Sequence, residues 1–95
     1  MSYMEIEIAD LQWDDFNIKH IARHGVSTSE VQEACHNCIY VDQTYADRYL
    51  LVGQTKQQRF LSIVLSKLTK IKYYVVTARD SSRGERKKAN DQENH

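Results

Sequence analysis

Two histidines and an asparagine recur at helical spacing near the start of the chain. On a projection of 100° per residue, Asn17, His20 and His24 fall within about 60° of one another, on the apolar-facing arc that begins at Trp13. A single half-buried histidine is usually a structural hydrogen-bonding residue, and His24, beside Gly25, could simply cap a helix C-terminus. Two histidines in register favour proton transfer, for which His20 is the better candidate.

The sequence CHNC at 35–38 raises the question of a metal site. Cys35 and Cys38 could join His20 and His24 as four zinc ligands. However, the order H-x3-H…C-x2-C is not one that structural zinc motifs use, and a redox C-x-x-C follows a strand, whereas this one is expected to close a helix. We therefore expect no metal and no cofactor, and we keep a zinc-stabilised protein as the alternative.

The third candidate site is the segment TARDSSRGERKK at 77–88. Its basic side chains are Arg79, Arg83, Arg86, Lys87 and Lys88. If the preceding strand alternates throughout, Tyr73 and Arg79 share one face, and a helix that begins at a capping box of Ser82 and Glu85 follows. Bases in the first helical turn oppose the macrodipole, so Arg79 and Arg83 are better explained by a phosphate bound there. The alternative is a solvated helix whose arginines pair with Asp80 and Glu85.

The formal net charge is zero, but the charges are unevenly distributed. Residues 1–47 hold nine acidic side chains and two basic ones, whereas residues 66–88 hold eight basic and two acidic ones. This layout indicates that one face meets an anion such as nucleic acid, unless the two halves neutralise each other across the fold. No glycosidase-type carboxylate pair, nucleotide-binding glycine loop or G-x-S-x-G elbow is present. Histidines with arginines and lysines suit metal-free phosphodiester cleavage.

The elements that position these residues follow from periodicity and capping signals. Alternation predicts a strand at 5–11, and Asp14 or Asp15 can begin a helix that ends at His24. Ser27 and Glu30 form a capping box for a second helix, which should end near Cys35.

Residues 48–54, 59–66 and 71–79 are rich in β-branched and aromatic side chains and predict three strands after a short one at IYVD. Their four-residue loops have the length of hairpin connections. We expect a last helix over 83–90 and a frayed tail from about residue 91. The order predicts one α+β domain over residues 1–95, with a small antiparallel meander packed against two N-terminal helices and one C-terminal helix, all on one side of the sheet.

The segments WDDFNIKHIARHGVSTSEVQEA, RYLLVGQT, RFLSIVL and YYVVTARDSSRGERKK, in this order over residues 13–88, resemble the BrnT-like toxins. The most specific matches are Trp13, Asp14, Arg23 to Ser27 and Glu30, and then Thr77, Ala78, Arg79, Glu85 and Arg86. The resemblance implies a RelE-like fold and a ribonuclease toxin of a bacterial type II toxin–antitoxin pair. Two departures are His20, where many such toxins carry asparagine, and ACHNC, where a Phe- or Pro-containing turn is usual.

We accordingly expect metal-independent cleavage of RNA, with His20, Arg79 and Arg83 acting at the scissile phosphate. The expected RNA-binding residues are His24, Tyr73, Arg86, Lys87 and Lys88; Tyr74 is a second candidate for base stacking. The resemblance implies a cognate antitoxin, usually a ribbon-helix-helix DNA-binding protein, and a homodimer or a toxin–antitoxin hetero-oligomer. The alternative is a non-catalytic RNA- or partner-binding module of the same fold.

The sequence also predicts a location. No apolar stretch approaches the roughly 20 residues of a membrane span, and the acidic start MSYMEIEIAD does not have the pattern of a signal peptide. Two cysteines fit a reducing compartment. We expect a cytoplasmic protein with no membrane partner.

Overall fold

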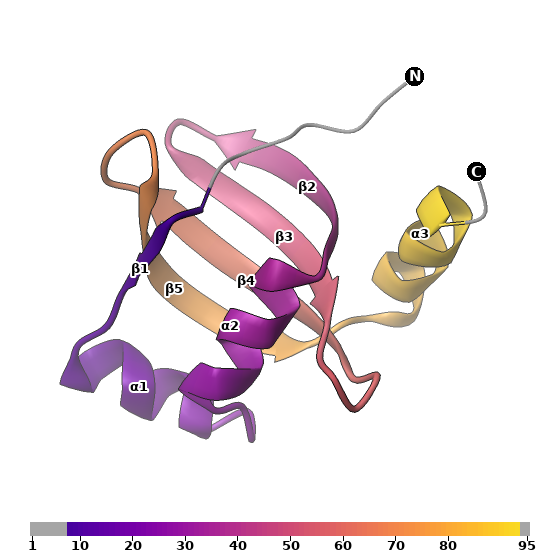
Figure 1. Ribbon diagram of the computed structural model, residues 1–95, viewed down its shortest axis with the longest axis horizontal. Helices are drawn as coiled ribbons and strands as arrows, with labels where there is room; N and C mark the ends of the chain where they lie inside the picture. The colour runs from indigo at the N-terminus through magenta and orange to yellow at the C-terminus, as the bar shows by residue number, and fades with distance from the viewer. Residues whose placement is uncertain (1–7, 94–95) are drawn as a thin grey trace.

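Five strands and three helices make up residues 8–93, the part of the chain that the computed structural model describes (Figure 1). They are β1 (Asp10–Gln12), α1 (Asp15–Ala22), α2 (Thr28–His36), β2 (Cys38–Tyr45), β3 (Arg48–Gln54), β4 (Phe60–Lys67), β5 (Lys72–Asp80) and α3 (Arg83–Glu93). The sheet order is β1-β5-β4-β3-β2, and β2 to β5 form the antiparallel meander that the sequence predicts. The α+β class and the order of elements are thus confirmed.

Several boundaries differ from the predicted ones. β2 continues to Tyr45, far beyond IYVD, because it pairs with β3 up to Arg48, although its outer half is polar and exposed and so carries no apolar signal. α1 ends at Ala22, two residues before His24. α3 reaches Glu93, three residues beyond its predicted end at residue 90. Residues 5–7 of the predicted first strand lie outside the described residues.

The first strand makes the sheet mixed rather than purely antiparallel. β1 lies at the edge and runs parallel to β5, with Asp10 to Gln12 opposite Lys72 to Tyr74. Beyond Gln12, the buried amide of Asn17 continues the edge, because its Nδ2 donates to the carbonyls of Gln12 (3.0 Å) and Val75 (3.1 Å). The inward orientation predicted for Asn17 is therefore correct, and its contacts give it a structural role.

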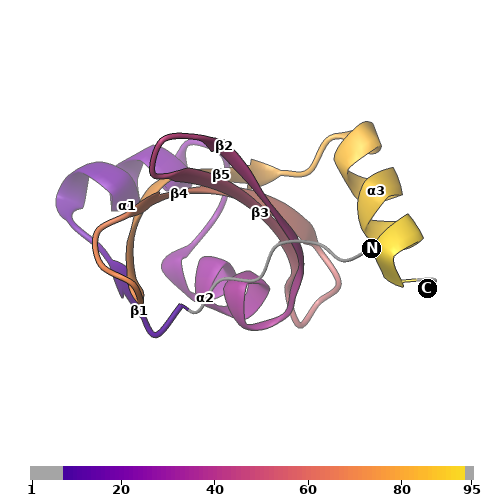
Figure 2. The same ribbon diagram turned by 90° about the horizontal axis from the view of Figure 1, so that it is seen from above.

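One core lies between the sheet and the first two helices. Asp14 and Ser27 cap α1 and α2 through complete capping boxes, which confirms the local signals in the sequence. The sheet curves around α2 (Figure 2), which packs so closely on β3 that a Cβ at Gly53 would lie 1.9 Å from the Ala34 carbonyl oxygen. The larger side chains buried here are Ile21, Val31, Val41, Leu51, Leu61, Ile63, Leu65, Tyr73 and Val75.

α3 lies on the opposite face of the sheet, so the prediction that all helices share one side is wrong. Tyr40 and Val52 alternate with Val41 and Leu51 along their strands and therefore point away from the first core. With Ile39, Phe60 and Ala89, they form a second, smaller cluster that seats α3. None of the described helices has the length and apolar character that a bilayer crossing requires.

A β-bulge changes the direction of the side chains within β5. Val75 is opposite Leu65 and Thr77 is opposite Val64, so Val76 has no partner on β4. After this extra residue, Ala78 points into the first core and Arg79, opposite Ser62, points to the α3 face. The prediction that Tyr73 and Arg79 share a face is therefore wrong.

Candidate functional site

The predicted basic segment spans the junction of β5 and α3, and its side chains lie on both sides of the sheet. Arg79 points to the α3 side, whereas Asp80 bonds with Arg59 on the side of α1 and α2. Ser81 is buried and shares a hydrogen bond of 2.8 Å with Ser62, and Ser82 caps α3. Two clusters of charged groups thus flank the end of one strand.

On the α3 side, Arg79 and Glu85 form a two-pronged ion pair. Its Nη1–Oε1 and Nη2–Oε2 distances are 2.8 and 3.0 Å. Glu85 also accepts hydrogen bonds from the Ser82 backbone N–H and the Ser62 hydroxyl, both at 2.8 Å. The Arg79 hydrogen bonds outweigh burial and lower the pKa of Glu85 to about 2. The Glu85 carboxylate therefore occupies the position between Arg79 and the helix start where we had expected an external phosphate.

On the other side, Arg59 joins three elements that the sequence does not connect. Its guanidinium contacts Asp80 (Nε–Oδ1, 2.7 Å) and Glu30 (Nη1–Oε2, 3.0 Å). It also donates to the backbone carbonyls of Gly25 (2.9 Å) and His24 (3.4 Å). The hydrogen bond from Arg59 lowers the pKa of Asp80. Sequence reasoning missed this residue, because an arginine between a polar loop and a strand carries no local signal.

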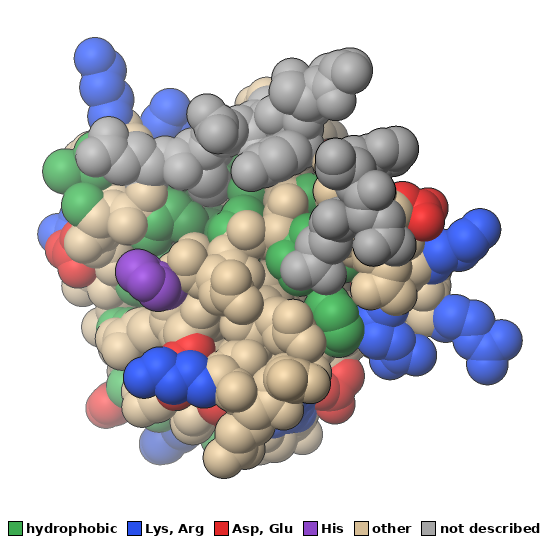
Figure 3. Space-filling model, turned by 45° about the vertical axis from the view of Figure 1, so that its right-hand side comes forward, with side chains coloured by type: hydrophobic (Ala, Val, Ile, Leu, Met, Phe, Trp, Pro, Cys, Tyr) green, Lys and Arg blue, Asp and Glu red, His purple; other side chains and the backbone are tan. Residues whose placement is uncertain are grey.

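The other basic residues of the segment divide into two groups. Lys88 bonds with Asp42 (Nζ–Oδ2, 2.6 Å) and lies over the Tyr40 ring, so it helps to seat α3. Arg83, Arg86 and Lys87 are exposed and make no ion pair with the side chains of residues 8–92, although Arg86 donates to the Ser81 carbonyl (3.1 Å). Figure 3 shows Lys and Arg side chains projecting from the side of the molecule where α3 lies. These three cations remain available to an anion.

His20 lies in the last turn of α1, and His24 lies two residues beyond the end of the helix. Asn17 and Ile21 fill the buried side of the helix, whereas His20 is half-buried and His24 is exposed. The predicted inward orientation is therefore correct for Asn17, partly correct for His20 and wrong for His24. The two imidazole rings meet edge to face at 5.7 Å. In the described part of the chain, no hydrogen bond joins either imidazole to Arg79 or Arg83. The structure thus does not bring the predicted acid–base and phosphate-binding residues into direct contact.

Tyr73 does not belong to an exposed binding surface. Its side chain is 1% exposed and packs edge to face against Tyr49, with ring centroids 5.9 Å apart. Because a base cannot reach this ring, the predicted stacking role of Tyr73 is wrong. Tyr74, on the opposite face of β5, is half-buried and donates its hydroxyl to Asp14 (3.1 Å).

The cysteines are free thiols in half-buried positions. Burial raises the pKa of Cys35 to about 12 and that of Cys38 to about 11, so both stay protonated near neutral pH. Within residues 8–93, no three His, Cys, Asp or Glu side chains form a metal-binding group. The described side chains therefore do not bring together the four ligands of the zinc alternative.

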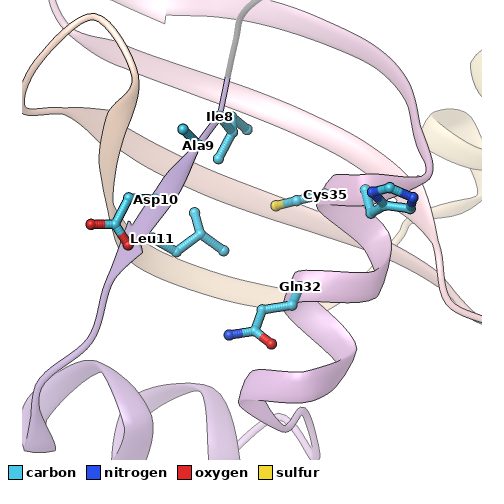
Figure 4. A pocket seen from close by; sticks show the side chains of 7 residues that line it. Ile8, Ala9, Asp10, Leu11, Gln32 and Cys35 are labelled. Carbon is cyan, nitrogen blue, oxygen red and sulfur yellow. The ribbon is translucent and has the colours of Figure 1, made fainter.

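A hollow of about 280 Å³ lies between β1 and α2. Its lining consists of residues 8–11 together with Gln32, Cys35 and His36 (Figure 4). Among the described residues that line this hollow, Asp10 is negatively charged at neutral pH, and no Lys or Arg is present. The hollow is thus poorly suited to a phosphate backbone, in contrast to the β5–α3 junction.

Comparisons with known proteins place the fold. No protein-family model matches the sequence, and no curated protein sequence matches it. The structure is similar to the crystal structure of the Brucella abortus ribonuclease toxin BrnT, with a TM-score of 0.63 and 19% sequence identity. The match covers 78% of this chain and 97% of the toxin. The expected BrnT-like fold is therefore confirmed.

Proposed function

We propose that this chain is a ribonuclease toxin of a toxin–antitoxin pair, which cleaves RNA without a metal ion. The observation that carries the proposal is the similarity to the Brucella toxin over 97% of that toxin's chain. The exposed cations Arg83, Arg86 and Lys87 support it independently, because a polyanion would compensate them. These three cations are the part of the uneven charge that lies on the outer side of α3.

RNA would bind across the part of the β5 edge that β1 leaves uncovered. β1 pairs only with residues 72–74, so no described strand follows the outer edge of residues 76–80. α1 packs beside this edge through Asn17, and α3 begins just beyond it. A single strand of RNA that crosses there would meet His20 and His24 on one side and Arg83 on the other.

In the proposed reaction, His20 takes the proton of a ribose 2′-hydroxyl, and the 2′-oxygen attacks the phosphorus. The bond from phosphorus to the 5′-oxygen breaks, that oxygen receives a proton, for which His24 is the nearest candidate, and a 2′,3′-cyclic phosphate remains. Arg83 would stabilise the extra negative charge of the phosphorane. Arg79 was expected to bind the scissile phosphate, but it pairs with Glu85 and would instead position α3 and Arg83.

The test is incubation of the purified protein with total RNA in EDTA, with electrophoresis and mapping of the new ends. We expect cleavage that leaves cyclic or 3′-phosphate ends, and strongly reduced cleavage by Arg83→Ala and His20→Gln. Lys70→Ala is the matched control, since it removes an exposed positive charge from the hairpin at the opposite end of β5. RNA that stays intact at high protein concentration would rule out the proposed activity.

A binding module without catalysis is the second candidate. It is favoured by the Arg79–Glu85 pair and by the lack of direct contact between the histidines and the arginines. This candidate predicts salt-sensitive RNA binding with no cleavage and no growth arrest on expression. Cleavage and binding assays on one preparation of the protein therefore distinguish the two functions.

The proposed partner is a cognate antitoxin that covers the basic side of α3, and a ribbon-helix-helix DNA-binding protein is the expected type. Co-expression with the product of the neighbouring reading frame should restore growth and yield a complex that co-purifies. Because Arg83, Arg86 and Lys87 would be covered, the complex should also lose RNA binding. A complex that binds RNA as tightly as the free chain would contradict this arrangement.

A further inference from the structure

An apolar ring projects into solvent from α1. Phe16 is 72% exposed, so its ring contributes little to the packing of the core. Its ring lies nearly parallel to the His20 imidazole, at an interplanar angle of 11° and a centroid distance of 6.2 Å. The edge-to-face contact of His20 with His24 continues the row. The three rings thus form a row that starts on α1 with Phe16 and ends at His24, two residues beyond the helix.

Two cations lie beside this row of rings. Lys19 and Arg23 are exposed, and with Phe16 and His20 they line a shallow hollow of about 120 Å³. Neither cation makes an ion pair in the described range. Among nearby acids, Asp14 is engaged with Tyr74 and the Asn17 backbone, which leaves Asp15 as the exposed carboxylate of this helix turn. The surface therefore combines ring faces with available positive charge.

The row leads toward the β5–α3 junction. Its last ring belongs to His24, whose backbone carbonyl accepts a hydrogen bond from Arg59. Arg59 in turn holds Asp80, the last residue of β5, three positions before Arg83. A strand of RNA that contacts Arg83 would thus reach α1 by passing the Arg59–Asp80 pair.

We infer that Phe16, Lys19, His20 and Arg23, the α1 shelf, bind an unpaired nucleotide next to the scissile phosphate. This inference rests on the proposed function, since it takes RNA as the substrate. The base stacks on the Phe16 ring, and Arg23 and Lys19 contact the adjoining phosphates, which is how proteins commonly hold single-stranded RNA. The hollow is too small to enclose a nucleotide, so the shelf holds the base on an open face and gives weak sequence preference.

A protein partner is the other conceivable occupant of the shelf. Protein interfaces bury a broad surface of about 800 Å² per partner around an apolar centre. The shelf instead offers one large apolar side chain, and Ile18, the other large exposed apolar residue of α1, points to a different side of the helix. One exposed ring beside two cations fits a nucleotide better than it fits a protein interface.

The experiment measures binding of a fluorescent, single-stranded 2′-O-methyl RNA by anisotropy, because this RNA lacks the attacking hydroxyl. We expect Phe16→Ala to weaken binding about 5- to 150-fold, as for loss of one base–aromatic stack. Phe16→Trp should keep or increase the affinity, whereas Phe16→Leu, which retains apolar area without a π face, should behave like Phe16→Ala. Arg23→Gln should lower the slope of log Kd against log salt by about 1.

Ile18→Ala is the control, because it removes an exposed apolar side chain from the same helix. Phe16 variants should melt as the wild type does, since the ring is exposed. Unchanged RNA affinity of Phe16→Ala overturns the inference while the proposed function stands. Phe16-dependent binding without cleavage of natural RNA supports the shelf and overturns the catalytic proposal instead. Loss of antitoxin binding without loss of RNA binding would assign the shelf to a protein and overturn the inference.

Discussion

Replacing Glu85 by glutamine tests the ion pair that holds α3 on the sheet. Glutamine keeps the shape of the side chain and an oxygen that can accept the Ser82 hydrogen bond. It removes the negative charge that pairs with Arg79. A fall of the pKa of Glu85 from 4.5 to about 2 corresponds to about 3 kcal/mol of the free energy of unfolding. Because the Arg79 side chain is 42% exposed, water screens part of this interaction. We therefore expect Glu85→Gln to lower the free energy of unfolding by about 2 kcal/mol at pH 7.

The pH dependence gives a second signature. The folded pKa of Glu85 is depressed, so its contribution is fully present above the unfolded value of 4.5 and is lost as the pH falls toward about 2. The difference between wild type and Glu85→Gln should be largest above pH 5, and less than half of it should remain at about pH 3. At still lower pH, both proteins carry a neutral side chain and should converge.

Urea unfolding at pH 7 and pH 3 measures both quantities, with fluorescence of the single tryptophan, Trp13, for the core and circular dichroism for the helices. Asp91→Asn is the control, since Asp91 is an exposed carboxylate of α3 without an ion pair in the described range. Equal stability of Glu85→Gln and wild type at pH 7 would refute the reasoning. So would a difference that persists unchanged at pH 3.

Three further substitutions test the packing around the candidate site, each followed by urea unfolding. Gly53→Ala should destabilise the fold by at least 1–3 kcal/mol, because its Cβ would collide with the Ala34 carbonyl; a neutral effect would contradict the close approach of α2 to β3. Asn17→Ala should cost about 2–3 kcal/mol, since it leaves the Val75 carbonyl without its donor; a cost below 0.5 kcal/mol would contradict that role. Arg59→Lys should lower the free energy of unfolding by about 1–2 kcal/mol, because an ammonium group cannot contact both carboxylates and the carbonyls at once. Full stability would show that the planar guanidinium of Arg59 is not required.

Features encoded by neighbouring residues could be predicted from the sequence. The capping box of Ser27 and Glu30 specifies the start of α2 through groups three residues apart, and the structure contains both of its hydrogen bonds. The meander followed from alternating strands and short loops, because each hairpin pairs adjacent segments. The inward position of Asn17 followed from helical periodicity alone.

Features that depend on distant residues could not be predicted in this way. The role of Arg59 requires Gly25, Glu30 and Asp80, which come from three other parts of the chain. The pairing of Arg79 with Glu85 was visible only as an alternative, because the direction of Arg79 depends on the pairing of β5 with β4. The charges of the basic segment were correctly identified, but which of them are neutralised is a tertiary property.

The unpaired Val76 has a consequence for the comparison of related sequences. Before it, alternate residues of β5 contribute to the core; after it, the same count leads to the opposite face, where Arg79 meets α3. In a relative that lacks this extra residue, an arginine six positions after the equivalent of Tyr73 would project toward α1 and α2 and could not take the same partner. An alignment with such a relative therefore needs a gap at Val76, and equivalent arginines are identified by the strand residue opposite them, here Ser62.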